Sequence, residues 1–189
     1  LAALNKGISV NQKMLDSPIT SGTWSPKNFS NKYEGKISIK RAFAKSSNVV
    51  AVKLADIVGR DVIIEQIKKL GITSKIQNEL SMPLGVAEIS LLEVVGSYVP
   101  LCGEGKPIIP YGIEEINLRN GESYWKRLKP ERRKNISYKV NRNIKRLLRE
   151  VVVDGTGKQL SKLSFTVLGK TGTTQYNRDA WFIGCTKGY

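Results

Sequence analysis

Two short clusters of polar residues have types and spacing that could bind and activate a substrate. The first is Ser46-Ser47-Asn48, which interrupts two helical patterns. A hydroxyl and a carboxamide two residues apart on a short turn can point into the same cleft. Serine and asparagine are also common where helices begin, so a helix cap at Asn48 is the alternative interpretation.

The second cluster, Lys170-Thr171-Gly172-Thr173, ends a strand-like stretch. Strand alternation places Lys170 and Gly172 on one side and Thr171 and Thr173 on the other. Glycine within a strand often marks a close approach of a ligand or of another backbone. An ammonium group and hydroxyls around a bare backbone suit an extended substrate that carries a carboxylate. Ordinary polar residues on an edge strand are the alternative.

The residue types that are absent narrow the chemistry. The chain contains no histidine, which excludes a histidine-based triad and a histidine-ligated zinc site. Nucleophilic chemistry must therefore use lysine, a carboxylate or a hydroxyl as its proton acceptor. Cys102 and Cys185 match no metal-ligand spacing and are expected to be free thiols in or near a core. The sequence thus predicts no metal site and no other cofactor.

The first half of the chain is expected to be mostly helical, because apolar residues recur there at helical spacing. Residues 1–4 look like the last turn of a helix that stops at Gly7, so its front half is expected before Leu1. Residues 8–36, rich in serine, asparagine, proline and glycine, predict an ordered loop. Three helical stretches follow, the first broken at Ser46-Ser47-Asn48 and the second capped by Asp61: 37–58, 61–70 and 89–101.

The second half of the chain contains the expected strands. Asn120-Gly121, between residues 112–118 and 122–128, is a strong hairpin signal. An amphipathic helix is predicted over 140–152, and two strands over 164–173 and 180–185. Helices followed by strands favour an α+β fold, in which a helical subdomain packs on an antiparallel sheet. Neither a repeat nor a domain linker divides residues 1–189.

Composition is that of a folded protein, with 40% hydrophobic and 25% charged residues. Apolar runs stay below the roughly 18 residues that cross a bilayer. The net charge of +15 is concentrated in residues 119–149, where twelve lysines and arginines face two glutamates. Such a segment could track nucleic acid or an anionic membrane. No nucleic-acid-binding motif accompanies it, so a solvated basic face is favoured and nucleic acid is not an expected partner.

The two clusters, in this order, resemble the second and third motifs of the penicillin-binding protein and serine β-lactamase superfamily. The resemblance covers nearly the whole chain and is weakest over residues 106–137. Further stretches resemble class A penicillin-binding proteins more narrowly: Leu1-Ala2-Ala3-Leu4, Trp24-Ser25-Pro26-Lys27-Asn28, Tyr33-Glu34-Gly35, Ala44 to Val52, Gly155-Thr156-Gly157, Gly169 to Thr173 and Asp179-Ala180-Trp181-Phe182.

The first motif of that superfamily is Ser-x-x-Lys, in which the lysine takes the proton of the nucleophilic serine. The resemblance places it just before Leu1. It also implies a further strand and a C-terminal helix after Tyr189, so the chain is expected to be an incomplete transpeptidase domain. Ser123 begins the only Ser-x-x-Lys within the chain. Because it lies on a predicted hairpin strand, where positions i and i+3 face opposite sides, Ser123 is not expected to be the nucleophile.

The resemblance implies serine acyl transfer by a D,D-transpeptidase that cross-links peptidoglycan stem peptides. Ser46 would pass a proton between the missing lysine and the leaving nitrogen, and Asn48 would bind the backbone amide of the donor peptide and help position that lysine. Lys170 would supply positive potential for the terminal carboxylate and for the proton path. Thr171 and Thr173 would bind that carboxylate or the acyl chain around Gly172, and the Thr173 amide would belong to the oxyanion hole.

The expected partners are therefore the D-Ala-D-Ala ends of stem peptides, and β-lactams that acylate the same serine. The family implies the extracytoplasmic face of the bacterial inner membrane, reached through an upstream membrane anchor. Without the serine, residues 1–189 alone are expected to be inactive. A D,D-carboxypeptidase, a β-lactamase and a non-catalytic remnant or pseudoenzyme that serves as a binding module are the alternatives.

Overall fold

The computed structural model describes residues 1–20, 22, 24–29, 31–129, 134–173 and 179–187. Its α-helices are α1 (Ala2–Asn5), α2 (Ile39–Ala44), α3 (Asn48–Val58), α4 (Arg60–Lys69), α5 (Leu91–Cys102) and α6 (Tyr138–Asp154). Its strands are β1 (Lys13–Asp16), β2 (Gly35–Ser38), β3 (Glu115–Asn117), β4 (Ser123–Lys126), β5 (Leu168–Thr173) and β6 (Ala180–Cys185). Short 3-10 helices cover Met82–Leu84 and Lys158–Lys162.

Strands β5 and β6 form the antiparallel pair that carries the Lys-Thr-Gly-Thr segment, with Leu168 opposite Cys185 and Thr173 opposite Ala180. The bounds predicted for β6 are confirmed. Strand β5 begins at Leu168 rather than at residue 164, because a 3-10 helix and exposed residues precede it. Gly169 has no room for a side chain, since a Cβ there would collide with the ring of Phe182.

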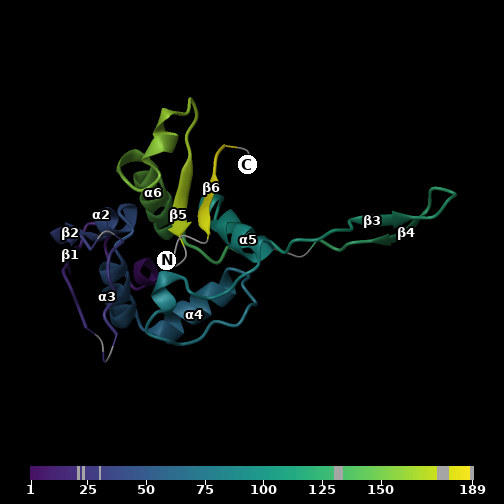
Figure 1. The fold of residues 1–189 in the computed structure, drawn as a ribbon. Coiled ribbons are helices and arrows are strands. Elements are labelled where there is room, and N and C mark those ends of the chain that lie inside the picture. The colour runs from purple at the N-terminus through teal and green to yellow at the C-terminus, as the bar shows by residue number, and fades with distance from the viewer. Residues whose placement is uncertain (21, 23, 30, 130–133, 174–178, 188–189) are drawn as a thin grey trace.

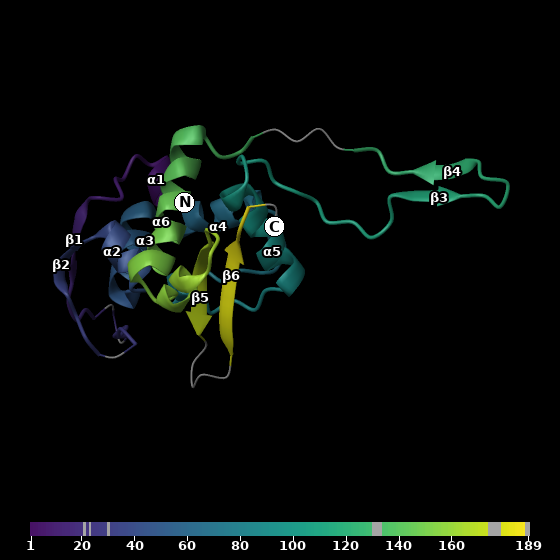
Figure 2. The same cartoon turned by 90° about the horizontal axis from the view of Figure 1, so that it is seen from above.

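Helix α6 packs against β5 and α2, while α5 contacts β6 (Figures 1 and 2). The side of α6 that faces the core is buried at regular helical spacing: Val140, Ile144, Leu147, Leu148, Val151 and Val152. Residues from the N-terminus, α2 and β5 pack on the same cluster, including Leu1, Phe43 and Leu168. The expected α+β arrangement, with helices on an antiparallel sheet, is confirmed.

The expected loop over residues 8–36 is partly wrong, because it contains β1 and the start of β2. These strands pair in antiparallel fashion, from Lys13 opposite Ser38 to Asp16 opposite Gly35. Met14 and Asp16 point inward and are buried. The buried position of β1 that follows Met14 is an aspartate, so the sequence lacks the apolar alternation that identifies a strand.

Serine hydroxyls cap four of the helices at Ser38, Ser47, Ser90 and Ser137. The cap predicted at Asp61 is wrong, because Gly59 occupies the N-cap position of α4. Asp61 lies in the first turn instead, where its carboxylate accepts a hydrogen bond from Asn78 Nδ2 at 2.6 Å. A carboxylate at this position still interacts favourably with the helix dipole.

The predicted hairpin is confirmed. Strands β3 and β4 are antiparallel, and the turn contains Gly121 with a φ of 89°, a conformation that favours glycine. In both views the hairpin extends away from the helical body (Figures 1 and 2). Ser123 begins β4.

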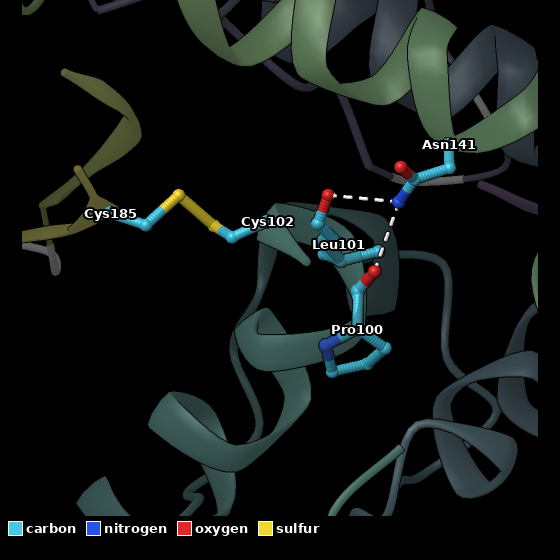
Figure 3. The surroundings of a disulfide bond; sticks show 5 residues. All are labelled: Pro100, Leu101, Cys102, Asn141 and Cys185. Atoms are coloured by element: carbon cyan, nitrogen blue, oxygen red, sulfur yellow. Dashed lines mark hydrogen bonds between the residues drawn. A yellow bond between two sulfur atoms is a disulfide. The ribbon is translucent and has the colours of Figure 1, made fainter. Parts of the chain in front are cut away.

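The prediction that both cysteines are free thiols is wrong. Cys102 and Cys185 form a disulfide with a Cα–Cα distance of 6.2 Å across a sequence separation of 83 residues. It joins the end of α5 to the end of β6 (Figure 3). Nearby, the Nδ2 of Asn141 on α6 donates hydrogen bonds to the carbonyl oxygens of Pro100 and Leu101, at 2.9 and 3.1 Å. The disulfide could not be predicted from the sequence, because only the fold brings these two distant cysteines together.

Candidate active site

The turn between α2 and α3 carries Lys45, Ser46 and Ser47, and Asn48 is the first residue of α3. The amide of Ser47 bonds to the carbonyl of Ala42 at 2.9 Å, and that of Ser46 to the carbonyl of Phe43 at 3.2 Å. This pair of bonds is a Schellman motif, which ends α2. Ser47 then begins α3, because its hydroxyl accepts a hydrogen bond from Val50 N at 3.1 Å. Ser47 therefore caps α3, and the alternative interpretation of Asn48 as the helix cap is wrong.

Ser46 occupies the left-handed position of the Schellman motif, with a φ of 56°. Glycine is the usual residue there, because a Cβ makes this backbone conformation cost about 1–2 kcal/mol. Strain of this kind persists where the surrounding structure holds it, and it clusters at functional sites. This strained conformation makes Ser46 a candidate site residue.

The partner of that side chain is Lys170. Its Nζ lies 2.8 Å from the Oγ of Ser46 and 3.0 Å from the carbonyl oxygen of Thr171. It also lies 5.9 Å from the centroid of the Phe43 ring, at the end of α2. The two predicted clusters are thus brought into direct contact.

Burial lowers the pKa of Lys170 to about 8, because the charged ammonium loses solvation. Near neutral pH the group is mostly protonated and donates to the hydroxyl of Ser46. A minor neutral fraction can accept a proton, and an amine tuned in this way is suited to proton transfer near physiological pH.

The loop after α6 lies against both halves of this site. The amide of Thr156 donates to the carbonyl of Ala44 at 3.1 Å, and its hydroxyl lies 2.5 Å from that of Thr171. Gly155 is packed so tightly that a Cβ would collide with the carbonyl oxygen of Ala44. The sequence analysis assigns no site role to Gly155-Thr156-Gly157. Its resemblance to the family was the signal that could have indicated one.

Ion pairs fix the end of α6 to α2 beside this loop. Asp154 accepts hydrogen bonds from Lys45, at 3.4 Å, and from Arg41. Lys45 is the main cause, and Arg41 a further one, of the lowered pKa of the Asp154 carboxyl. The end of α2, the end of α6 and β5 therefore meet around Ser46.

The two sides predicted for β5 are consistent with these contacts, since Lys170 reaches Ser46 and Thr171 reaches Thr156. Gly172 and Thr173 are exposed. A Cβ at Gly172 would have only Trp181 Cβ, at 4.0 Å, as a neighbour. Within the described part of the chain, β6 is the one strand paired with β5. The end of β5 thus presents accessible backbone beside Lys170.

Asn48 lies at the first position of α3, and its side chain is held in place. Its Nδ2 donates to the carbonyl of Lys27 at 2.8 Å, and its backbone amide donates to Asn28 Oδ1 at 3.0 Å. Among the described residues, no hydrogen bond joins Asn48 to Ser46 or Lys170. Its predicted contact with a peptide substrate remains a prediction.

Ser123 has a different environment. Its hydroxyl hydrogen bond is the main cause of the lowered pKa of the Glu115 carboxyl on the facing strand. The strand that contains it belongs to the extended hairpin (Figure 2). Lys126 also bonds to Glu115, at 3.2 Å. Ser123 and Lys126 therefore both interact with Glu115 on the facing strand. The described residues contain no cluster of three or more side chains able to hold a metal ion.

Comparison with known proteins gives the family of this chain and the class of its fold. The family profile described as the penicillin binding protein transpeptidase domain matches residues 1–188. The structure of penicillin-binding protein 1A from Haemophilus influenzae superposes with a TM-score of 0.86 at 23% identity, over 97% of this chain and 34% of that one. PonA1 from Mycobacterium tuberculosis, in complex with penicillin V, superposes with a TM-score of 0.86 at 19% identity, over 98% and 54%.

The chain therefore belongs to the penicillin-binding protein transpeptidase domain family. Its similar relatives include class A proteins named penicillin-binding protein 1A. That of Rickettsia prowazekii (strain Madrid E) is 31% identical over 214 residues, or 98% of this chain and 27% of the relative. That of Aquifex aeolicus (strain VF5) is 34% identical over 190 residues, or 97% and 26%. The chain spans about a quarter of the length of these relatives.

Proposed function

We propose that Ser46, Asn48 and Lys170 to Thr173 form the substrate-docking half of a D,D-transpeptidase active site. The complete enzyme would cross-link peptidoglycan stem peptides by serine acyl transfer. The observation that carries the proposal is the 2.8 Å contact between Lys170 Nζ and Ser46 Oγ. It joins two motifs of the family in a pair able to move a proton. The family match over residues 1–188 supports the same conclusion.

In this proposal Ser46 and Lys170 form a short proton relay. The hydroxyl of Ser46 donates its proton to the leaving nitrogen of the scissile amide and regains one from the ammonium of Lys170. The pKa of about 8 lets Lys170 release and recover that proton near neutral pH. Its positive charge also attracts the terminal carboxylate of the donor peptide.

The donor peptide would dock in extended form along β5. Exposed backbone at Gly172 and Thr173 supports this, because strand addition supplies main-chain hydrogen bonds. Thr171 and Thr173 would bind the carboxylate or the acyl chain, and the Thr173 amide would donate to the oxyanion. Asn48 would bind the peptide amide of the donor.

The nucleophile would come from a Ser-x-x-Lys motif on a segment joined at Leu1. Leu1 packs against the core cluster that Leu168 of β5 also contacts. This shared packing supports a nucleophile carried close to β5. Residues 1–189 alone would then bind a substrate but not become acylated.

The proposed location is the extracytoplasmic face of the bacterial inner membrane. The Cys102–Cys185 disulfide supports it, because disulfides persist in oxidising compartments. No described helix is both long and apolar enough to cross a membrane.

Labelling with a fluorescent penicillin tests the proposal. We define the parent polypeptide as the longer chain that contains residues 1–189 and a preceding Ser-x-x-Lys segment. It should be labelled covalently, whereas residues 1–189 alone should not. Lys170→Ala should slow labelling of the parent, while Lys13→Ala, a change at an exposed strand lysine, should not. Labelling of residues 1–189 that is lost in Ser123→Ala would contradict the proposal.

A further inference from the structure

A buried carboxylate lies directly beneath the Ser46 turn. The side chain of Asp16 on β1 has a relative exposure of 2%. Its Oδ1 accepts hydrogen bonds from Ser47 Oγ at 2.8 Å and Asn28 Nδ2 at 2.9 Å. Its Oδ2 accepts one from the amide of Glu34 at 2.9 Å. A buried carboxylate is costly unless hydrogen bonds satisfy it, so Asp16 depends on these three donors.

Asn28 extends this network to the start of α3. Its Oδ1 accepts hydrogen bonds from the amides of Asn48 at 3.0 Å and Val49 at 3.4 Å. These amides are among the first donors of the helix, which have no partner within the helix itself. Asn48 in turn donates to the carbonyl of Lys27. The segment around Asn28 therefore caps α3 from a distant part of the sequence.

The network surrounds a strained residue. Ser46 keeps a φ of 56° although it is not glycine, and such a conformation requires support from its neighbours. On one side, α2 supplies the Schellman hydrogen bonds. On the other side, Ser47 is buried and bonded to Asp16. A change at Asp16 or Asn28 would free the α3 side of the turn, and with it the direction of the Ser46 hydroxyl.

We propose that Asp16 and Asn28 are positioning residues, which hold Ser46 and Asn48 in the orientation needed for acylation. This inference rests on the proposed transpeptidase function. Neither residue would touch the substrate. They act through Ser47 and through the first amides of α3, and together they set the distance between Ser46 and Lys170. Misplacement by about 1 Å at a catalytic group can cost up to about 100-fold in rate.

A purely structural role would predict something different, namely a loss of stability without a specific loss of acylation. Asn141 provides the matched control. It is a buried asparagine, with a relative exposure of 5%, whereas Asn28 is partly buried. Asn141 donates two hydrogen bonds to the carbonyls of Pro100 and Leu101. Those partners lie at the end of α5 that carries the disulfide (Figure 3).

The experiment measures acylation of the parent polypeptide by a fluorescent penicillin over a range of concentrations, at a temperature where each variant is folded by circular dichroism. Asn28→Ala should lower the maximal acylation rate by about 10- to 100-fold, with little change in the half-saturating concentration. Asn141→Ala should lower the melting temperature to a similar extent but change acylation less than about twofold. Asp16→Asn keeps an acceptor for Ser47 but places a second donor against the Glu34 amide. Its loss of acylation rate should therefore lie between those of Asn28→Ala and Asn141→Ala.

Equal acylation rates for the wild type and Asn28→Ala would overturn the positioning role. Equal losses of acylation rate in Asn28→Ala and Asn141→Ala would overturn it as well. If Asn28→Ala does not fold, Asp16→Asn decides the question by the same comparison with Asn141→Ala. Failure of the unmodified parent polypeptide to become labelled would contradict the proposed transpeptidase function, and it is a separate outcome from either of these.

Discussion

The ammonium nitrogen of Lys170 lies 2.8 Å from the hydroxyl oxygen of Ser46, although 124 positions separate the two residues. Three packed elements create this contact. Helix α2 ends at the turn that carries Ser46, and β5 carries Lys170. Helix α6 packs against both. Any change in the packing of α6 should therefore be transmitted to the pair.

The left-handed backbone of Ser46 makes one pair of substitutions informative. Ser46→Ala and Ser46→Gly both remove the hydroxyl, but only glycine relieves the strain at a φ of 56°. The glycine variant should be more stable than the alanine variant by about 1 kcal/mol, as measured by chemical denaturation. Both variants should lose acylation in the parent polypeptide. Equal stability would show that Ser46 does not adopt this conformation in solution.

The partly buried ammonium of Lys170 predicts a dependence of stability on pH. Its pKa is lowered to about 8 in the folded protein, compared with about 10.4 when unfolded. Below pH 8 the group is charged in both states, and burial of the charge opposes folding. Between pH 8 and about 10.4 the unfolded state binds more protons, so stability should rise with pH.

The measurement compares the free energy of unfolding of the wild type and Lys170→Met across this range, because contributions from other groups then largely cancel. The wild type should gain about 1–3 kcal/mol relative to the variant between pH 8 and about 10.4. Parallel curves for the two proteins would contradict the lowered pKa of Lys170 in the folded protein.

The candidate site was largely predictable because its signals are local. Ser46-Ser47-Asn48 interrupts a helical pattern, and Lys170 to Thr173 follows a strand pattern. The support for the site was not predictable. Asp16 is an aspartate where a strand pattern expects an apolar residue, and the hydroxyl that satisfies it lies 31 positions away on Ser47. The same reason explains the missed disulfide, since a separation of 83 residues carries no information on proximity.

Gly155 should be intolerant of any side chain. A Cβ there would collide with the carbonyl of Ala44 and lie 2.7 Å from the Cα of Val151, so α6 would have to move away from the Ser46 turn. Gly155→Ala should destabilise the protein by about 1–3 kcal/mol and slow acylation of the parent polypeptide. Gly112→Ala is the control, because nothing lies within 4 Å of the added atom. A Gly155→Ala variant as stable as Gly112→Ala would contradict this packing.

The disulfide should contribute substantially to stability, because it connects α5 to β6 across 83 residues. A cross-link over a loop of this length restricts the unfolded chain, and removing such a bond typically costs about 2–4 kcal/mol. Reduction should therefore lower the denaturant midpoint of the wild type. The double variant Cys102→Ser/Cys185→Ser should unfold at that lower midpoint with or without reductant, which controls for other effects of the reagent.

Because β6 pairs with β5 along its whole length, reduction should also slow acylation of the parent polypeptide. An unchanged midpoint would show that the two cysteines are not joined in solution.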